Sequence, residues 1–269
     1  MTRHIGVVVN PERTDVADEF IARLRDHGCS VTATTPEDAD ALGEAIDELV
    51  GQGVDAVAAI GGDGTQRTAA ARIAGGSVPL AVVAGGFSYA DSLGAGRMLA
   101  LDLALGVGDA LRGFVADGRP LLGICNGFQV LTAAGILPGA LGHNAQGRFD
   151  CRWVVLDPVP ESSSVWTTGI DAPIHCPIAH GEGRYVHPDP DALAANGQVA
   201  LRYRSTNPNG SVADIAGVGD PSGVVLGLMP HPENHIVTRQ HPRHSRGGGG
   251  EEHLGLRLFH NGIRHAKGV

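Results

Sequence analysis

The sequence predicts an α/β protein with a mainly parallel, doubly wound sheet that carries helices on both faces. Short apolar runs alternate with segments of helical periodicity along the first part of the chain, which is the order expected of βα units. The 269 residues include 40 glycines, and a fold with many strand-to-helix turns uses glycine often. The hydrophobic fraction of 42% is that of a globular protein with a sizeable core.

The elements are expected in the following order. Strands are predicted at residues 5–10, 29–33, 54–60, 79–83 and 120–124. Helices are predicted at 14–27 and 36–51, and a third helix follows residues 61–65 and ends at about residue 74. After Ala140 the pattern changes to shorter strands at 152–156, 174–179 and 198–203, which indicate a small antiparallel edge. Residues 207–210 predict a turn, and residues 254–266 an amphipathic helix.

Charge and cysteine content exclude several classes of function. The net charge is −9 and the basic residues form no run, so nucleic acid is not an expected partner. No apolar stretch approaches the ~20 residues of a membrane span. Residues 1–4 lead directly into a predicted strand, so no signal peptide is expected. The four cysteines are widely spaced without CxxC pairs, which argues against a zinc site and a disulfide framework and fits a cytoplasmic protein.

A candidate nucleophile lies where an apolar strand turns into a helix. Cys125 follows the run 120–124, and the segment 128–134 reads as a helix. Glycines at positions 123 and 127 would let the strand and the helix approach closely, and the helix N-terminus would favour a thiolate. The alternative is a buried structural cysteine, as most free cysteines are.

Two other motifs favour the nucleophile. His231 lies between two prolines after the apolar run 224–226, and Glu233 could orient its ring. These residues would supply the base and the orienting group that a cysteine nucleophile needs. Gly85 and Gly86 follow the strand 79–83, and their N–H groups could stabilise an oxyanion.

Five segments together resemble the glutaminase subunit of phosphoribosylformylglycinamidine synthase, a class I glutamine amidotransferase of purine biosynthesis. They are GGFSYADSLGAG, LGICNGFQVLTAAGILPGAL, CPIAHGEGRYV, NPNGSVADIAG and GLMPHPENH. The resemblance runs from about Val83 to the C-terminus and implies a flavodoxin-like core. It also implies release of ammonia from L-glutamine for a separate ATP-dependent synthetase, which converts formylglycinamide ribonucleotide to formylglycinamidine ribonucleotide. ATP and magnesium would belong to that partner, and this chain would carry no cofactor.

The resemblance also implies residue roles. Cys125, His231 and Glu233 would form the catalytic triad, and Gly86 and the Asn126 N–H would form the oxyanion hole. The glutamine pocket would be lined by Gln129, His180, Gly181, Glu182 and Arg184. For His180 a zinc ligand is the alternative, and for Arg184 a surface salt-bridge residue. The histidines at 231, 235, 241, 244 and 253 suggest a metal only by number, and a solvated loop fits their irregular spacing better.

The first third of the chain departs from that family. Residues 5–83 resemble instead the N-terminal half of NAD kinases and diacylglycerol kinases, whose GGDGT loop lies at the nucleotide phosphates. Here the loop is Gly61, Gly62, Asp63, Gly64 and Thr65. A glycine-rich loop before a helix offers N–H groups to phosphate, although it could also be a tight βα turn. Phosphate binding by this loop is therefore one alternative function, and a catalytically weakened interaction subunit is another.

We expect one domain over residues 1–269. The kinase-like βα units of residues 1–83, which include an additional βα unit, would share their sheet with the glutaminase part at 84–269, because no linker separates Val83 from Gly85. Ala84 and Ala90 stand where the family usually has proline and glycine. If Ala90 adopts a positive φ, it strains the oxyanion loop by about 1 kcal/mol or more.

Overall fold

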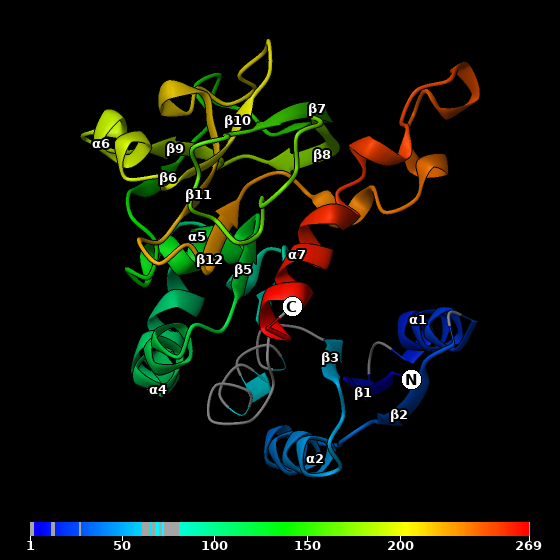
Figure 1. The fold of residues 1–269 in the computed structure, drawn as a ribbon. Helices are drawn as coiled ribbons and strands as arrows, with labels where there is room; N and C mark the ends of the chain where they lie inside the picture. Colours follow the sequence, from blue (N-terminus) through cyan, green and yellow to red (C-terminus); the bar gives the residue numbers. More distant parts are fainter. Residues whose placement is uncertain are drawn as a thin grey trace. The chain divides into compact units, whose positions relative to one another are not determined.

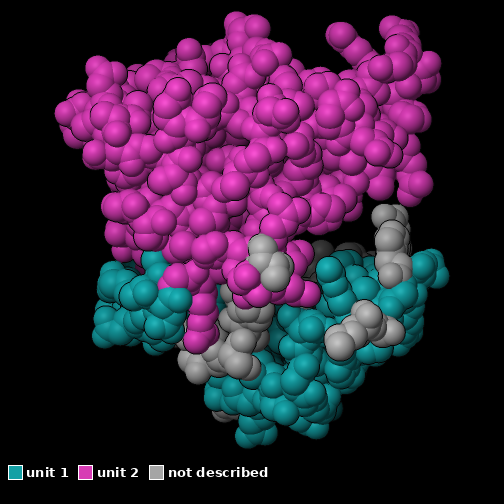
Figure 2. All heavy atoms as spheres, in the orientation of Figure 1, with its two compact units in different colours: residues 1–81, 101–117 teal, residues 82–100, 118–269 magenta. Residues whose placement is uncertain are grey.

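The computed structural model describes residues 3–11, 14–26, 28–60, 65, 68–69, 72 and 81–268 (Figure 1). The chain forms two compact units (Figure 2). Unit 1 comprises Met1–Ala81 and Leu101–Asp117, and unit 2 comprises Val82–Ala100 and Gly118–Val269. The boundary between them passes through the long helix α4, Arg97–Ala116, which the sequence patterns did not predict.

Unit 1 contains a three-stranded parallel sheet in the order β2-β1-β3. Its strands are β1 (His4–Val9), β2 (Ser30–Thr34) and β3 (Ala56–Ile60), and its first helices are α1 (Thr14–Asp26) and α2 (Ala39–Gly51). Side chains of a strand alternate between the two faces of the sheet. Accordingly Val8 packs in a cluster with Ile46 of α2, whereas Val7 packs in another with Ile21 of α1. The helices therefore cover both faces, as predicted.

Unit 2 is built on a seven-stranded sheet in the order β4-β5-β12-β11-β10-β7-β8. In that order the strands are Ala81–Val83, Leu121–Ile124, Val225–Leu228, Ile215–Gly219, Val199–Tyr203, Asp150–Pro158 and Ile174–His180. The central β5 and β12 are parallel, and the pairs from β12 through β8 are antiparallel. A two-stranded sheet joins β6 (Ala140–Gly142) and β9 (Arg184–Val186). The α/β class is confirmed, and the antiparallel part is larger than predicted.

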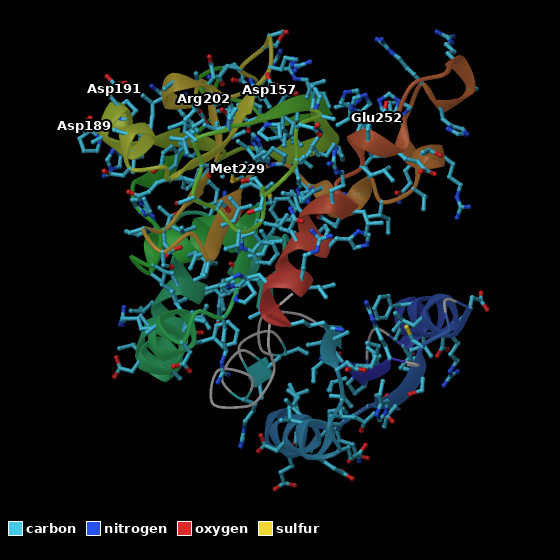
Figure 3. All side chains as sticks on the ribbon, viewed as in Figure 1. Asp157, Asp189, Asp191, Arg202, Met229 and Glu252 are labelled. Carbon is cyan, nitrogen blue, oxygen red and sulfur yellow. The ribbon has the colours of Figure 1, made fainter. Side chains whose placement is uncertain are left out.

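The helices of unit 2 are short. They are α5 (Asn126–Ala133), α6 (Pro190–Ala195) and α7 (Leu256–Ala266), with 3₁₀ turns η2 (Ser88–Asp91), η3 (Val212–Asp214), η4 (Pro232–Asn234), η5 (Thr238–Gln240), η6 (His244–Arg246) and η7 (Glu251–His253). The Asp189 side chain caps α6 by accepting a 2.9 Å hydrogen bond from the Ala192 N–H, and Asp191 lies in the first turn (Figure 3). None of the described helices is long and apolar enough to cross a membrane.

The prediction of one shared sheet is wrong for the strands that the structure describes. A strand has only two edges, and β1 uses one for β2 and the other for β3. The additional strand β3 thus occupies an edge that β4 could have taken, and β4 pairs with β5 in the other sheet. That residues 1–269 form a single domain stays a prediction.

Candidate active site

Cys125 lies at a sharp turn between β5 and α5. Its backbone has φ 50° and ψ −106°, a conformation that costs a non-glycine residue free energy. The N–H of Cys125 donates to the Leu228 carbonyl of β12 at 2.8 Å, which fixes the turn to the neighbouring strand. A Cβ added at Gly123 would lie 2.9 Å from the Gly127 carbonyl oxygen, and one at Gly127 would collide with the Val83 carbonyl. Gly123 therefore permits the close approach of β5 to α5 that the sequence predicted, and Gly127 permits the approach of α5 to β4.

His231 follows β12, and its ring is hydrogen-bonded to the Glu233 carboxylate. The Nδ1–H donates to Glu233 Oε1 at 2.6 Å, and the His231 N–H donates to the Pro177 carbonyl at 2.8 Å. Burial alone would lower the pKa of His231, but hydrogen bonds and charges from Cys125 and Glu233 outweigh it and raise the pKa to about 10. Nε2 is buried and makes no hydrogen bond of good geometry in the described structure, although Cys125 is near enough to act on the ring. Such bonds often tighten only when substrate binds.

Gly85 shows that these side chains meet at one place. A Cβ added there would lie 2.9 Å from His231 Cε1 and 3.4 Å from Cys125 Cβ. Gly86, the next residue, has φ 156°, at the edge of the range that L-residues rarely adopt. The Asn126 N–H belongs to the first residue of α5, where helix N–H groups have no partner within the helix. The predicted oxyanion residues thus flank the predicted nucleophile.

Gln129 and the 180–184 loop are joined by a chain of hydrogen bonds. Gln129 Nε2 donates to the Glu182 carbonyl at 2.6 Å, and Gln129 Oε1 accepts from Asn126 Nδ2 at 3.0 Å. Asn126 Oδ1 in turn accepts from the Ser88 N–H at 3.3 Å. These hydrogen bonds therefore link the loop to the residue after the nucleophile and to residues 85–96, which we call the oxyanion segment.

The Glu182 side chain faces the same segment. Its Oε2 accepts from the Ala95 N–H at 3.4 Å. Burial and the negative charge of Glu182 together raise the pKa of Asp91, whose Oδ1 is buried without a partner. The Ser88 hydroxyl is likewise buried without a partner, so this segment holds two polar side-chain atoms that are free to bind a polar ligand.

His180 and Arg184 differ from each other in their surroundings. His180 Nδ1 lies 3.1 Å from Asn144 Oδ1, and burial lowers the pKa of His180 to about 4, so the ring is neutral. No group of three or more His, Cys, Asp or Glu side chains among the described residues could hold a metal ion, so the zinc alternative gains no support. Arg184 is exposed and donates through Nε to the Gly210 carbonyl at 3.2 Å. It is not part of the hydrogen-bond chain at Gln129.

Most of the C-terminal histidines do not lie in a solvated loop, contrary to the prediction, although His244 is exposed. His235 is fully buried, and its Nδ1–H donates to the His175 carbonyl at 2.7 Å. The His175 and His253 rings stack with centroids 4.2 Å apart, and His241 packs edge-on against Trp153. The irregular spacing of these histidines reflects packing against β8 and β7, which sequence periodicity does not reveal.

Several residues of this site carried no predicted role. They are Ser88, Asp91, Ala95, Asn144 and Asn209. All but Asn144 lie inside motifs that carry the family resemblance, GGFSYADSLGAG and NPNGSVADIAG, so the signal was position within a motif and not residue type.

A glycine at position 90 should relieve strain in the oxyanion segment. Ala90 has φ 51°, in the left-handed region. We expect Ala90→Gly to raise the free energy of unfolding by up to about 1 kcal/mol, because the left-handed penalty exceeds the entropy cost of glycine. Denaturant titration would measure it, with Ala213→Gly (φ 49°), far along the chain in η3, as the control. Both variants should gain stability and only Ala90→Gly should alter the glutaminase rate; a loss of stability in Ala90→Gly would contradict this.

Stability should fall in acid because two histidines are held neutral. Burial lowers the pKa of both His175 and His180 from 6.5 to about 4. Each group stabilises the fold fully above pH 6.5, and that contribution is lost as the pH falls toward 4, by at most about 1.4 kcal/mol per pH unit for His180 and less for the partly exposed His175. Urea midpoints of wild type and His180→Gln at pH 7 and about 5 test this. His260 is exposed, so the control His260→Gln should lose as much stability between these pH values as wild type. An equal loss of stability in wild type and His180→Gln, or a smaller loss in His260→Gln, would contradict this.

Comparison with known proteins decides the family. The CobB/CobQ-like glutamine amidotransferase domain matches residues 53–266. The chain is 39% identical over 246 residues to the PurQ subunit of phosphoribosylformylglycinamidine synthase from Mycobacterium tuberculosis, covering 90% of this chain and 92% of that one. The chain belongs to the PurQ family of glutamine amidotransferases.

Other matches agree with this family. The Treponema denticola PurQ subunit is 46% identical over 195 residues, which cover 59% of this chain and 72% of that protein. The solved structure of PurLQS from Thermotoga maritima aligns with a TM-score of 0.62 and 29% identity, over 98% of this chain and 99% of that one. The diacylglycerol kinase catalytic domain also matches, at residues 4–101. The resemblance of the N-terminal third to kinases is thus confirmed beside the glutaminase family.

Proposed function

We propose that this chain is the glutaminase subunit of a phosphoribosylformylglycinamidine synthase, with Cys125, His231 and Glu233 as its triad. The observation that carries the proposal is the meeting of Cys125, His231 and Gly85 at the ends of β5 and β12, with Glu233 bonded to His231. The PurQ relatives and the PurLQS complex support a separate synthetase as the partner. Side chains and water suffice for this chemistry, so no cofactor is required in this chain.

The first half of the reaction forms a thioester. The Cys125 thiolate attacks the side-chain amide carbon of glutamine, and the negative charge moves to the carbonyl oxygen, where the Gly86 and Asn126 N–H groups stabilise it by roughly 3 kcal/mol per donor. His231 then donates its proton to the departing nitrogen, and ammonia leaves. Because part of the raised pKa of His231 comes from Cys125, the pKa should fall once the thiolate is consumed. The ring thus becomes a stronger acid when the leaving group needs a proton.

The second half returns the enzyme to its starting state. Neutral His231 takes a proton from water, the hydroxide attacks the thioester carbon, and the carbon–sulfur bond breaks to release glutamate and the thiolate. Neutral His180 lies near enough to act electrostatically on His231, and a positive charge there would oppose the imidazolium. The burial of His180 therefore favours the protonated state of His231 that the first step needs.

Glutamine hydrolysis, measured with and without a cognate synthetase, tests the proposal. Wild type should release ammonia and glutamate in equal amounts, faster in the presence of the synthetase. An inactive wild type together with unreactive Cys125 would favour the alternative of an interaction subunit whose glutaminase site is weakened.

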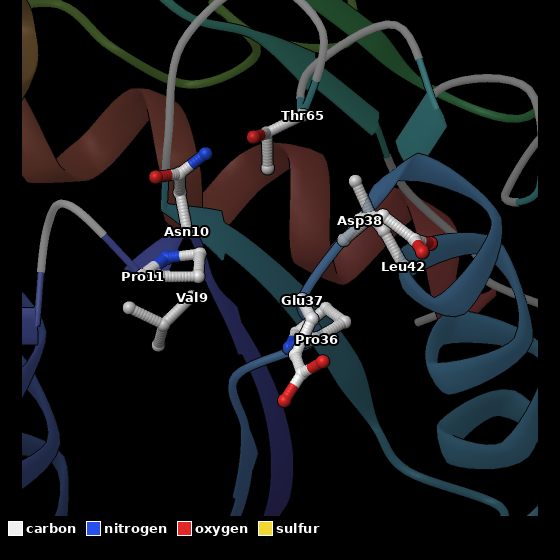
Figure 4. A pocket seen from close by; sticks show the side chains of 8 residues that line it. All are labelled: Val9, Asn10, Pro11, Pro36, Glu37, Asp38, Leu42 and Thr65. Carbon is white, nitrogen blue, oxygen red and sulfur yellow. The ribbon is translucent and has the colours of Figure 1, made fainter.

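A second candidate function is phosphate binding in unit 1. A pocket of about 170 Å³ is lined by Val9, Asn10, Pro11, Pro36, Glu37, Asp38, Leu42 and Thr65 (Figure 4). Thr65 closes the GGDGT loop, whose residues 61–64 lie outside the described part of the chain. The pocket is smaller than the ~300 Å³ of a typical ligand site, so it suits one part of a nucleotide.

The charge of this pocket sets a condition for binding. Glu37 and Asp38 would repel a bare phosphate, so a divalent cation is needed to bring the two together. Calorimetry with magnesium-ATP and with NAD tests this, and binding should be lost in Asp63→Ala. Glutaminase activity should be unchanged in that variant. Absence of heat with either nucleotide would remove the candidate.

A further inference from the structure

Two buried asparagines hold successive peptide groups of the 180–184 loop. Asn144 and Asn209 are 2% and 0% exposed. Asn144 Oδ1 accepts from the Gly183 N–H at 3.0 Å, and Asn209 Nδ2 donates to the Gly183 carbonyl at 2.7 Å. The peptide groups before and after Gly183 are therefore each fixed by one asparagine. We call Asn144 and Asn209 the asparagine clamp.

The peptide group that Asn144 holds is the one that Gln129 contacts. Its N–H belongs to Gly183 and its carbonyl to Glu182, and that carbonyl accepts from Gln129 Nε2 at 2.6 Å. A peptide group is planar, so fixing the direction of its N–H also fixes the opposite direction of its carbonyl. Asn144 therefore sets the acceptor that orients the Gln129 side chain.

All hydrogen-bonding groups of the clamp side chains are used. Asn144 Nδ2 donates to the carbonyls of His180 and Arg148, both at 2.9 Å, and Asn144 Oδ1 also lies 3.1 Å from His180 Nδ1. Because Oδ1 only accepts, His180 carries its proton on Nδ1. Asn209 Oδ1 accepts from the Ser211 N–H at 3.0 Å and from its hydroxyl at 2.7 Å. Only an amide both donates and accepts in this way.

Backbone hydrogen bonds join the segment of Asn144 to that of Asn209 and to the loop. The loop also has no room for a side chain at position 183. The Ala145 N–H donates to the Asn209 carbonyl at 2.9 Å, and the Asn144 N–H donates to the Gly181 carbonyl at 2.9 Å. A Cβ at Gly183 would collide with the His180 ring. The loop is thus held on one side by hydrogen bonds and on the other by the His180 ring.

We propose that the asparagine clamp positions the glutamine pocket. Asn144 and Asn209 orient the peptide groups around Gly183, these orient Gln129, and Gln129 orients Asn126 beside the nucleophile. The clamp touches no reacting atom, so it consists of positioning residues. This inference rests on the proposed glutaminase function and adds the residues that preorganise its substrate wall.

Asn144→Ala and Asn209→Ala test the clamp, with Asn261→Ala as a matched control. Asn261 is also buried and donates to two backbone carbonyls, those of Trp166 and Thr168, at 3.0 and 2.8 Å. We expect either clamp variant to raise the KM for glutamine roughly tenfold or more, because a buried peptide group loses its partner and can turn. The kcat should change less, since the clamp reaches Asn126 only through its side chain, whereas the Asn126 N–H belongs to the backbone at the start of α5. Asn261→Ala should lower Tm and leave KM unchanged.

Alkylation of Cys125 separates this inference from the proposed function. Iodoacetamide is small and does not use the glutamine pocket, so its rate with the clamp variants should stay within about twofold of wild type. Folded clamp variants with wild-type KM and a Tm loss like that of Asn261→Ala would overturn the clamp alone. Wild-type glutaminase activity in Cys125→Ser would instead overturn the proposed function.

Hydrogen exchange on the wild type keeps the inference testable if the variants do not fold. The Gly183 amide should be protected without glutamine, at a level close to the amides of β8. Exchange of the Gly183 amide at the rate of an open loop would show that the clamp does not preorganise the pocket.

Discussion

Replacing Cys125 with serine should reduce glutamine hydrolysis by several orders of magnitude while the fold and glutamine binding are kept. Serine has the shape of cysteine with a smaller terminal atom, and the turn is fixed by a backbone hydrogen bond to the Leu228 carbonyl, so it should pack as before. A serine hydroxyl has a far higher pKa than a thiol, and a histidine suited to a thiolate does not generate an alkoxide. The steady-state glutaminase rate and Tm of Cys125→Ser measure both effects.

The alternative of a buried structural cysteine predicts the opposite pattern. Burying a hydroxyl without a partner costs about 1–3 kcal/mol of stability and leaves any chemistry elsewhere untouched. Cys176→Ser provides the matched control, since Cys176 is fully buried and burial raises the pKa of its thiol. It should lower Tm and keep the rate. An unchanged rate with a lowered Tm in Cys125→Ser would overturn the catalytic assignment.

Replacing His231 with glutamine should reduce the rate by roughly 10²–10⁴, the usual contribution of a general acid and base. The amide of glutamine can still donate a hydrogen bond to the Glu233 carboxylate, but it cannot carry a proton to the departing ammonia. Glu233→Gln should cost less, because His231 stays in place and loses only the negative charge that helps to raise its pKa. Glutaminase rates of wild type, His231→Gln and Glu233→Gln, each measured as a function of pH, give the loss caused by each substitution.

The pH profiles add a test of the direction of the pKa shift. In wild type His231 should stay protonated in the free enzyme well above pH 6.5, because its pKa is raised to about 10. In Glu233→Gln the protonated state should be lost at lower pH, so activity on the alkaline side should fall earlier. A Glu233→Gln profile identical to wild type would contradict the orienting and electrostatic role of Glu233.

The position of the site could be predicted because it depends on neighbours in the sequence and on one strand pairing. The run before Cys125 and the helix after it are local signals, and both appear as β5 and α5. The ends of parallel strands meet at one edge of a sheet, and Leu228 of β12 pairs with Ile124 of β5. Residues just after each strand, Cys125 and His231, are therefore brought to the same place.

The sheet arrangement and the supporting polar residues could not be predicted in the same way. Strand pairing depends on which edge a distant strand occupies, and nothing in the sequence of β3 says that it takes the second edge of β1. Asn144 and Asn209 lie in turns without periodicity, so their burial follows only from the tertiary structure. His235 likewise is buried by contacts with β8, far away in the sequence.

Covalent labelling by a glutamine analogue with a reactive diazoketone tests the central claim most directly. Peptide mass spectrometry should find one adduct, on Cys125, and excess glutamine should suppress it. The exposed Cys151 serves as an internal control for non-specific reaction, and the adduct should be absent from Cys125→Ser. Labelling of Cys151 in place of Cys125, or labelling of Cys125 that glutamine does not slow, would contradict the assignment of a glutaminase site at this turn.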